Sequence, residues 1–231
     1  MVYAIIVAGG RGTRLPGHIA KQYLDLAGKP LLSHTVSVFC ACEAIDAIVL
    51  VVPEADITYC RDHILPRSMS AKDILLVAGG DDRQASVYNG INAVEGADDD
   101  IVMIHDGVRP FVTQTMIHSC IDGLGHADGC IAAVPAADTM KVVAEAHRIV
   151  HTIDRENVWL AQTPQAFGYG HIRNVHAAAA STNVTATDDA ALLERAGKTV
   201  TVVPGSSLNI KITTPEDLIL ARAILDIPGK S

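Results

Sequence analysis

The chain has 231 residues, of which 49% are hydrophobic and 19% are charged, and its formal net charge is −8. This length suits one compact domain over residues 1–231, and the apolar content argues against disorder. An acidic balance disfavours a nucleic-acid partner, because proteins that bind nucleic acid usually carry a basic excess. Any bound phosphate must therefore be held by a few local cations.

The five cysteines and the apolar runs indicate a cytoplasmic protein. The cysteines lack the CxxC spacing of a zinc or redox site, so we expect reduced, buried thiols and no metal ligands from the protein. No apolar run approaches the roughly 20 residues that cross a bilayer, and the early run is too short for a signal peptide. We therefore expect no membrane partner.

Short runs rich in Ile and Val alternate with longer amphipathic segments. The short runs predict buried strands at Tyr3–Val7, Ala47–Val52, Ile74–Val77, Ile101–His105, Cys130–Val134 and Thr199–Val203. The amphipathic segments predict helices near Leu31–Ala44, Ala55–Leu65, Arg83–Val94, Gln114–Leu124, Tyr169–Ser181, Asp188–Ala196 and Pro215–Ile227. This alternation predicts an α/β fold with a mostly parallel sheet and a ligand at the carboxyl ends of the strands.

The first predicted strand ends in a glycine-rich turn, Ala8-Gly9-Gly10-Arg11-Gly12-Thr13-Arg14. Glycines let backbone N–H groups approach a phosphate closely, and Arg14 and Lys21 supply cations for a triphosphate. The turn lacks the GK[ST] of a Walker A loop and the third glycine of a dinucleotide fingerprint. Without the two cations, simple turn chemistry would explain the glycines equally well.

Other strand ends carry polar residues that suit an anionic ligand. Asp106 follows the strand Ile101–His105, Arg109 lies three residues further on, and we expect His105 to be structural. The turn at Gly79-Gly80 enters a helix that contains Ser86, which can read the edge of a base. Lys211 lies in a short apolar segment that we expect to be a strand, where it either protects a sheet edge or binds phosphate.

One segment interrupts the strand–helix alternation. Residues 138–154 contain two short alternating runs around Ala144–His147, which predict a β-hairpin projecting from the sheet. An isolated two-stranded hairpin is marginal in water, so we expect it to pack against a second subunit. The alternative is a hairpin that folds onto its own domain.

Taken together, the sequence resembles the 2-C-methyl-D-erythritol 4-phosphate cytidylyltransferases of the non-mevalonate isoprenoid pathway. The similarity covers nearly the whole chain. Its further markers, in order, are Lys21-Gln22-Tyr23, Gly79–Arg83, His105–Pro110, Asp138–Lys141, Asp154-Arg155, Gln162–Phe167, Thr187–Asp189 and Lys211–Leu218. The resemblance implies a Rossmann-like α/β fold and a homodimer joined by a β-hairpin arm at residues 138–155.

The resemblance also implies roles for individual residues. Catalysis would involve Arg14 and Lys21, which bind the CTP phosphates, and Arg155 and Lys211, which position the acceptor phosphate. Nucleotide-binding residues would be Ala8, Gly9, Gly10, Gly12, Gly80, Asp81, Ser86 and Asp106. Residues that contact the polyol phosphate would be Arg109, Thr139, Thr163 and Thr187, with Thr139 and Arg155 reaching into the partner's site. Mg²⁺ would be the cofactor, held mainly by the CTP phosphates.

Three alternatives to this activity stay open. Val108 and Ala146 depart from the family pattern, and valine at position 108 is frequent in ribitol 5-phosphate cytidylyltransferases, so the acceptor polyol is the first open point. An NAD-dependent dehydrogenase is disfavoured by the missing third glycine. A non-catalytic nucleotide-binding module would bind CTP without releasing pyrophosphate.

Overall fold

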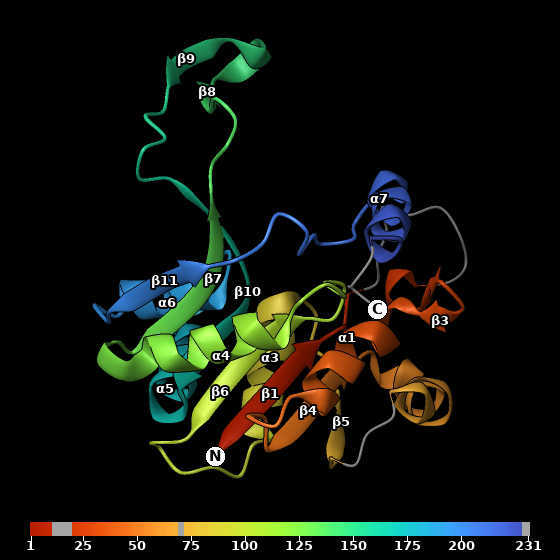
Figure 1. Cartoon of the computed structure of the whole chain (residues 1–231). Coiled ribbons are helices and arrows are strands. Elements are labelled where there is room, and N and C mark those ends of the chain that lie inside the picture. The colour runs from red at the N-terminus through yellow and green to blue at the C-terminus, as the bar shows by residue number, and fades with distance from the viewer. Residues whose placement is uncertain (11–19, 69–71, 228–231) are drawn as a thin grey trace.

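A seven-stranded sheet forms the centre of the molecule in the computed structural model, which describes residues 1–10, 20–68 and 72–227 (Figure 1). Its strand order is β11-β7-β10-β6-β1-β4-β5. The strands are β1 (Val2–Val7), β4 (Ala47–Val52), β5 (Ile74–Ala78), β6 (Ile101–Asp106), β7 (Gly129–Pro135), β10 (Trp159–Gly168) and β11 (Val200–Pro204). All the strands predicted from the apolar runs are present, and the predicted mostly parallel α/β architecture is confirmed.

Strand β10 was not predicted, and it alone within this sheet runs antiparallel, between β6 and β7. Its sequence contains Pro164, which cannot donate a hydrogen bond to a sheet ladder. The register between β10 and β7 shifts between Ala161 and Gln165, so the proline falls in this irregularity. The sheet therefore accommodates β10, although the proline in its sequence is typical of a loop.

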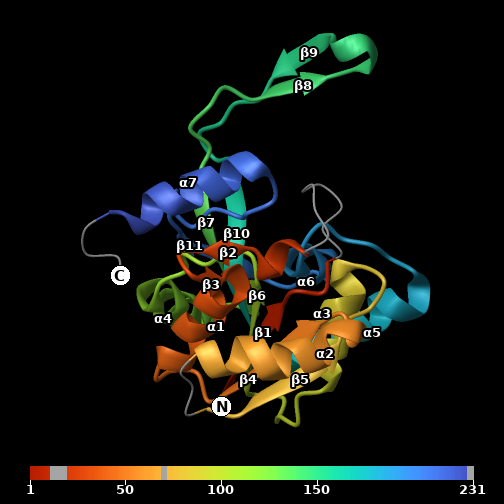
Figure 2. The same cartoon turned by 90° about the vertical axis from the view of Figure 1, so that its right-hand side faces the viewer.

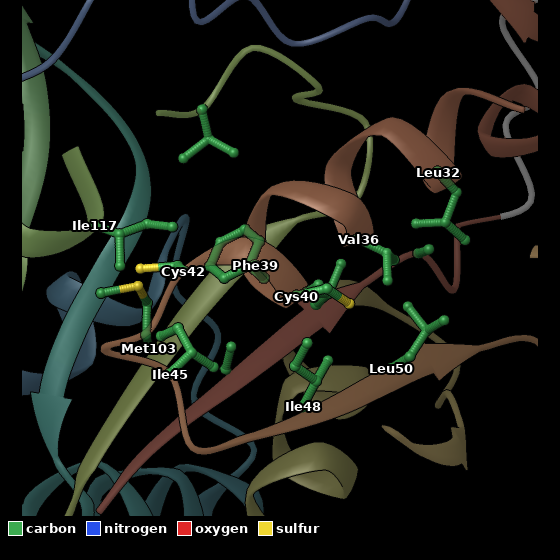
Figure 3. Packing of buried hydrophobic residues seen from close by; sticks show 14 of the residues in the cluster. Leu32, Val36, Phe39, Cys40, Cys42, Ile45, Ile48, Leu50, Met103 and Ile117 are labelled. Atoms are coloured by element: carbon green, nitrogen blue, oxygen red, sulfur yellow. The ribbon is translucent and has the colours of Figure 1, made fainter. Parts of the chain in front are cut away.

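The two faces of the sheet carry separate hydrophobic cores, because successive side chains of a strand point to opposite faces. On β1, Ala4 and Ile6 pack in one cluster, whereas Ile5 and Val7 pack in the other. The first cluster includes residues of α1 (Leu31–Ala41) and α4 (Gln114–Asp122), and Figure 3 shows Phe39 of α1 among its members. The second includes residues of α3 (Arg83–Asn92), α5 (Tyr169–Thr182) and α6 (Asp189–Arg195).

Helix α7 (Pro215–Leu225) begins as the sequence indicates. The Thr214 hydroxyl accepts a hydrogen bond from the backbone N–H of Asp217, and the Asp217 carboxylate accepts one from the N–H of Thr214 at 2.8 Å. Pro215 occupies the first turn, where its missing N–H costs nothing. This reciprocal capping fixes where the segment after Lys211 turns into a helix.

The prediction of a single helix near Ala55–Leu65 is wrong in detail. The segment consists of a 3-10 turn (Glu54–Asp56), α2 (Ile57–Tyr59), a π-helical turn (Cys60–Ile64) and a second 3-10 turn (Leu65–Arg67). Pro66 in the last turn has no N–H to continue an α-helical ladder. The predicted apolar face still reaches the core, where Cys60 and Ile64 are fully buried.

The segment predicted as a hairpin contains the antiparallel pair β8 (Lys141–Val143) and β9 (Ile149–Thr152). Figures 1 and 2 show this pair standing away from the main sheet. Val143, Ile149 and Val150 are 51–58% exposed, so these apolar side chains are not buried against the hairpin's own domain. Its expected packing against a second subunit stays a prediction.

A short pair, β2 (Asp25–Leu26) and β3 (Lys29–Pro30), precedes α1. All five cysteines are free and buried. Within the residues that the structure describes, no helix is both long and apolar enough to cross a membrane.

Candidate active site

The site lies at the carboxyl edge of the sheet, where the central strands β1 and β6 end side by side at Val7 and Asp106. A cavity of about 370 Å³ opens there. Its lining includes most of the predicted nucleotide-binding residues and the two predicted catalytic lysines: Ala8, Gly9, Gly10, Lys21, Gly80, Asp81, Ser86, Asp106 and Lys211. Gly12 and Arg14 lie outside the described residues.

The turn between β5 and α3 is built around the hydroxyl of Ser86. This hydroxyl donates to the carbonyl of Asp82 at 2.7 Å and accepts the N–H of Gly80 at 3.1 Å. Asp82 caps α3 by accepting the N–H of Ala85 at 2.7 Å. The turn is therefore fixed before a ligand arrives, and base recognition by Ser86 stays a prediction.

Asp106 is the electrostatic centre of the cavity. Its Oδ2 lies 2.8 Å from Lys211 Nζ and 3.6 Å from Arg109 Nε, and its Oδ1 lies 3.0 Å from Arg83 Nε. Burial alone would raise the pKa of this carboxyl, but the charges of Arg83 and Lys211 hold it well below its usual range. One ionised carboxylate thus gathers three cations at the wall of the cavity.

A second cavity of about 260 Å³ adjoins the first, since Arg83, Asp106 and Lys211 line both. The predicted acceptor-binding residues Arg109, Thr163 and Thr187 also line this second cavity. Thr139 and Arg155 are exposed near the two ends of the hairpin segment and line neither cavity. The structure therefore brings together most predicted site residues, but not these two.

His105 is a structural residue, as expected. Its Nε2 lies 3.1 Å from the carbonyl of Arg109, which can only accept, so Nδ1 must accept from the Thr163 hydroxyl at 3.0 Å. The Thr163 oxygen in turn accepts the backbone N–H of Asp106 at 3.1 Å. Complete burial lowers the pKa of His105 to about 4, which keeps the ring neutral and this arrangement intact.

Lys211 does not lie in a strand, which corrects the prediction from the sequence. It belongs to an extended segment between β11 and α7, where the N–H of Ile212 donates to the carbonyl of Val108 at 2.9 Å. This bond forms no ladder, and Asn209 also ties the segment to the sheet by donating to the carbonyl of Thr163 at 2.9 Å. Protection of a sheet edge is thus no longer needed to explain Lys211, whose ammonium points to Asp106.

Sequence reasoning missed Arg83, which lines both cavities and pairs with Asp106 and with Asp189, 2.9 Å from its Nη1. Arg83 directly follows the Asp82 cap, and a cation at the start of a helix is an unusual choice because the helix dipole favours acids there. That mismatch was a usable signal. Asp189 itself gave none, because an acid in the first turn of α6 has an ordinary explanation.

The groups at this edge suit the handling of a nucleotide and a second anion. Two cavities meet at a cluster of ammonium and guanidinium groups, and a glycine turn lies at the rim. Across the described ranges, no group of three or more His, Cys, Asp or Glu is placed to hold a metal ion. The fold and the site together define an α/β enzyme of the nucleotidyltransferase class.

Comparison with known proteins agrees with this class. The model of the family described as 2-C-methyl-D-erythritol 4-phosphate cytidylyltransferase matches residues 2–227. The protein of that name from Geotalea uraniireducens is 49% identical over 225 residues, covering 97% of this chain and 96% of its own. The chain belongs to the 2-C-methyl-D-erythritol 4-phosphate cytidylyltransferase family.

Solved structures give the same result. The 4-diphosphocytidyl-2C-methyl-D-erythritol synthase of Anaerococcus prevotii is similar with a TM-score of 0.86 and 32% identity, covering 97% of this chain and 95% of that one. The 2-C-methyl-D-erythritol 4-phosphate cytidylyltransferase of Francisella tularensis has a TM-score of 0.80 and 34% identity, covering 96% and 98%. The predicted family and enzyme class are therefore confirmed.

Proposed function

We propose that this enzyme joins CTP and 2-C-methyl-D-erythritol 4-phosphate to give 4-diphosphocytidyl-2-C-methyl-D-erythritol and pyrophosphate. The observation that carries the proposal is the meeting of two cavities at the Asp106–Lys211 pair. The nucleotide occupies the cavity with the glycine turns, and the acceptor phosphate occupies the cavity of Arg109 and Thr163. The reacting phosphates then meet beside Lys211.

The chemistry needs charge neutralisation more than proton transfer. A phosphate monoester has a second pKa near 6, so the acceptor is largely a dianion at neutral pH and needs no general base. An acceptor oxygen attacks the α-phosphorus of CTP, the bond to the β-phosphate breaks, and pyrophosphate leaves with the electron pair. Lys21 and Lys211, with the Arg14 of the glycine turn, would stabilise the charge that develops.

Mg²⁺ fits this site as a companion of CTP. Mg²⁺ takes oxygen ligands and commonly binds through one or two carboxylates plus substrate phosphates. Here the buried Asp106 carboxylate is already paired with Arg83 and Lys211, so the triphosphate would supply most of the ligands. When bound, the ion would neutralise phosphate charge.

The exposed apolar side chains of the hairpin support a homodimer. A partner surface would cover the exposed Val143, Ile149 and Val150, and Thr139 and Arg155 line neither cavity of their own chain. In the dimer each hairpin would cover its partner and place Thr139 and Arg155 in the partner's acceptor cavity. We place this dimer in the cytoplasm.

A pyrophosphate-release assay tests the activity. Each of the four nucleoside triphosphates is offered with 2-C-methyl-D-erythritol 4-phosphate, and CTP is also offered with ribitol 5-phosphate. We expect turnover only for CTP with the methylerythritol acceptor. Equal or faster turnover of ribitol 5-phosphate would overturn the acceptor, and CTP binding without pyrophosphate would overturn catalysis.

Subunit mixing tests the shared site. An Arg155→Ala protein and a Lys21→Ala protein should each be weakly active, because each site lacks one cation. Mixed dimers regain one intact site, so activity should recover on mixing under conditions of subunit exchange. Exchange shown by mass spectrometry without recovery would refute a site shared between subunits.

A further inference from the structure

A continuous chain of charged and polar side chains runs from the cavity into the core. It links Lys211, Asp106, Arg83, Asp189 and His176 with successive distances of 2.8, 3.0, 2.9 and 3.1 Å. The members come from the segment before α7, the end of β6 and the starts of α3 and α6, with His176 on α5. This order indicates that the buried residues Asp189 and His176 hold the residues at the cavity in place.

We propose that Arg83 is a positioning residue, which orients the Asp106 carboxylate so that Lys211 stays at the boundary of the two cavities. The inference rests on the proposed function, because it assigns Lys211 to the reacting phosphates. Arg83 Nε binds Asp106 Oδ1, which leaves Oδ2 for Lys211 at 2.8 Å and for Arg109 at 3.6 Å. Because Arg83 holds Oδ1 of Asp106 in place, Oδ2 is held in place as well, and it determines the positions of the Lys211 and Arg109 cations.

The guanidinium of Arg83 suits this task because it is a rigid planar fork. Two different nitrogens contact two different carboxylates, Nε with Asp106 and Nη1 with Asp189. A lysine has one ammonium on a flexible stem, so it keeps the charge but cannot hold both carboxylates in the same geometry. An Arg83→Lys substitution therefore separates charge from orientation.

Asp189 and His176, at the buried end of this series of side chains, are held firmly in the core. Asp189 is 1% exposed, and the His176 ring that contacts its Oδ1 is fully buried and stacks on Tyr88 with an interplanar angle of 6°. Burial raises the pKa of the Asp189 carboxyl, but the Arg83 charge and the His176 hydrogen bond bring it below its usual value. An ionised Asp189 thus gives Arg83 a fixed support behind the cavity.

Lys211 needs such positioning, since its side chain is 38% exposed and it lies in a segment outside the sheet. If Asp106 rotates, the ammonium of Lys211 follows it or moves toward solvent. The lining of the nucleotide cavity by Lys21 and the Gly80 turn does not depend on this contact. Loss of Arg83 should thus impair kcat and acceptor binding while CTP binding is largely kept.

Steady-state kinetics on the full-length protein test the proposal, with Arg83→Lys as the variant. We expect kcat/KM for the acceptor to fall about ten- to hundredfold, in line with misplacement of a reacting group by about 1 Å, and KM for CTP to change less than about threefold. Arg173→Lys is the matched control, because Arg173 also pairs with an aspartate, Asp98 at 2.7 Å, but on the surface away from both cavities. It should leave the kinetics unchanged.

A double-mutant cycle with Asp106→Asn distinguishes positioning from a general loss of stability. If Arg83 acts through Asp106, Arg83→Lys should have little further effect on kcat/KM in the Asp106→Asn background. Additive losses, or wild-type kinetics for Arg83→Lys, would overturn the inference alone. An inactive wild-type protein would overturn the proposed function and this inference with it. If Arg83→Lys fails to fold, the isosteric Asp189→Asn replaces it in the same cycle, with the same two outcomes.

Discussion

Replacing Gly80 with alanine should destabilise the protein through a single steric conflict. A Cβ at this position would lie 2.5 Å from the Cβ of Ala85 and 3.1 Å from its carbonyl carbon. Carbon atoms in contact are about 3.5–4.0 Å apart, so Gly80 and the first turn of α3 must separate by about 1 Å. Ala85 lies in the first turn of α3 and its N–H is bound by Asp82, so the backbone itself must move.

Overpacking of this kind costs about 1–3 kcal/mol. For a chain of this length, each kcal/mol lowers the melting temperature by about 2–4 °C, so Gly80→Ala should melt about 2–12 °C below the wild type. The displacement also strains the hydrogen bond from the Gly80 N–H to Ser86, 3.1 Å long. We therefore expect a raised KM for CTP as well.

Circular dichroism melts and CTP kinetics measure both effects. Gly168→Ala is the control, since Gly168 also precedes a helix but its Cβ would meet only His171, at an ordinary 3.6 Å. That substitution should cost about 1 kcal/mol or less, because only the preference for glycine over alanine at the N-cap is lost. Equal melting temperatures for Gly80→Ala and the wild type, or equal losses for the two variants, would refute the steric argument.

Three further outcomes are expected. Lys21→Ala should lower kcat at least about a hundredfold while leaving the fold intact, because one strong electrostatic stabiliser is lost; normal turnover of CTP would exclude that role. The folded-state pKa of His105, about 4, lies below its unfolded value near 6.5, so the folded protein binds fewer protons in that window. The free energy of unfolding should therefore fall as the pH drops from 6.5 to 4, with a contribution of up to about 1.4 kcal/mol per pH unit from this ring; urea titrations of His105→Gln should show a shallower dependence, and an unaltered slope would contradict the assignment. Ala146 has a left-handed backbone with φ 56°, a conformation that costs a residue with a Cβ about 1–2 kcal/mol. Ala146→Gly should therefore slow amide hydrogen exchange in β8 and β9, whereas faster or equal exchange would show that the turn is unstrained.

Local features of the chain determined much of the fold. The apolar runs that predicted β1, β4 and β6 are strands because they are buried on both faces, which requires continuous Ile and Val. The start of α7 follows from Thr214 and Asp217, whose capping contacts span only three residues. Such features depend only on residues that are neighbours in the sequence, so they can be predicted without knowledge of the fold.

The candidate site was partly readable for the same reason. Ala8, Gly80 and Asp106 each follow a predicted strand, and parallel strands bring their carboxyl ends to one edge. Thr139 and Arg155 carry no such constraint within one chain, and the structure leaves them exposed. In the proposed dimer, their contribution would come through a second subunit.

Only the tertiary structure decided how distant residues meet. Strand β10 contains Pro164 and enters the sheet because β6 and β7 offer unpaired edges on both sides of it. Lys211 reaches Asp106, 105 positions earlier, and Arg83 joins Asp106 to a buried Asp189. Sequence patterns report whether a side chain is buried and which local contacts it makes, but the direction in which it points, and the charge it meets there, depend on the packing of elements far apart in the chain.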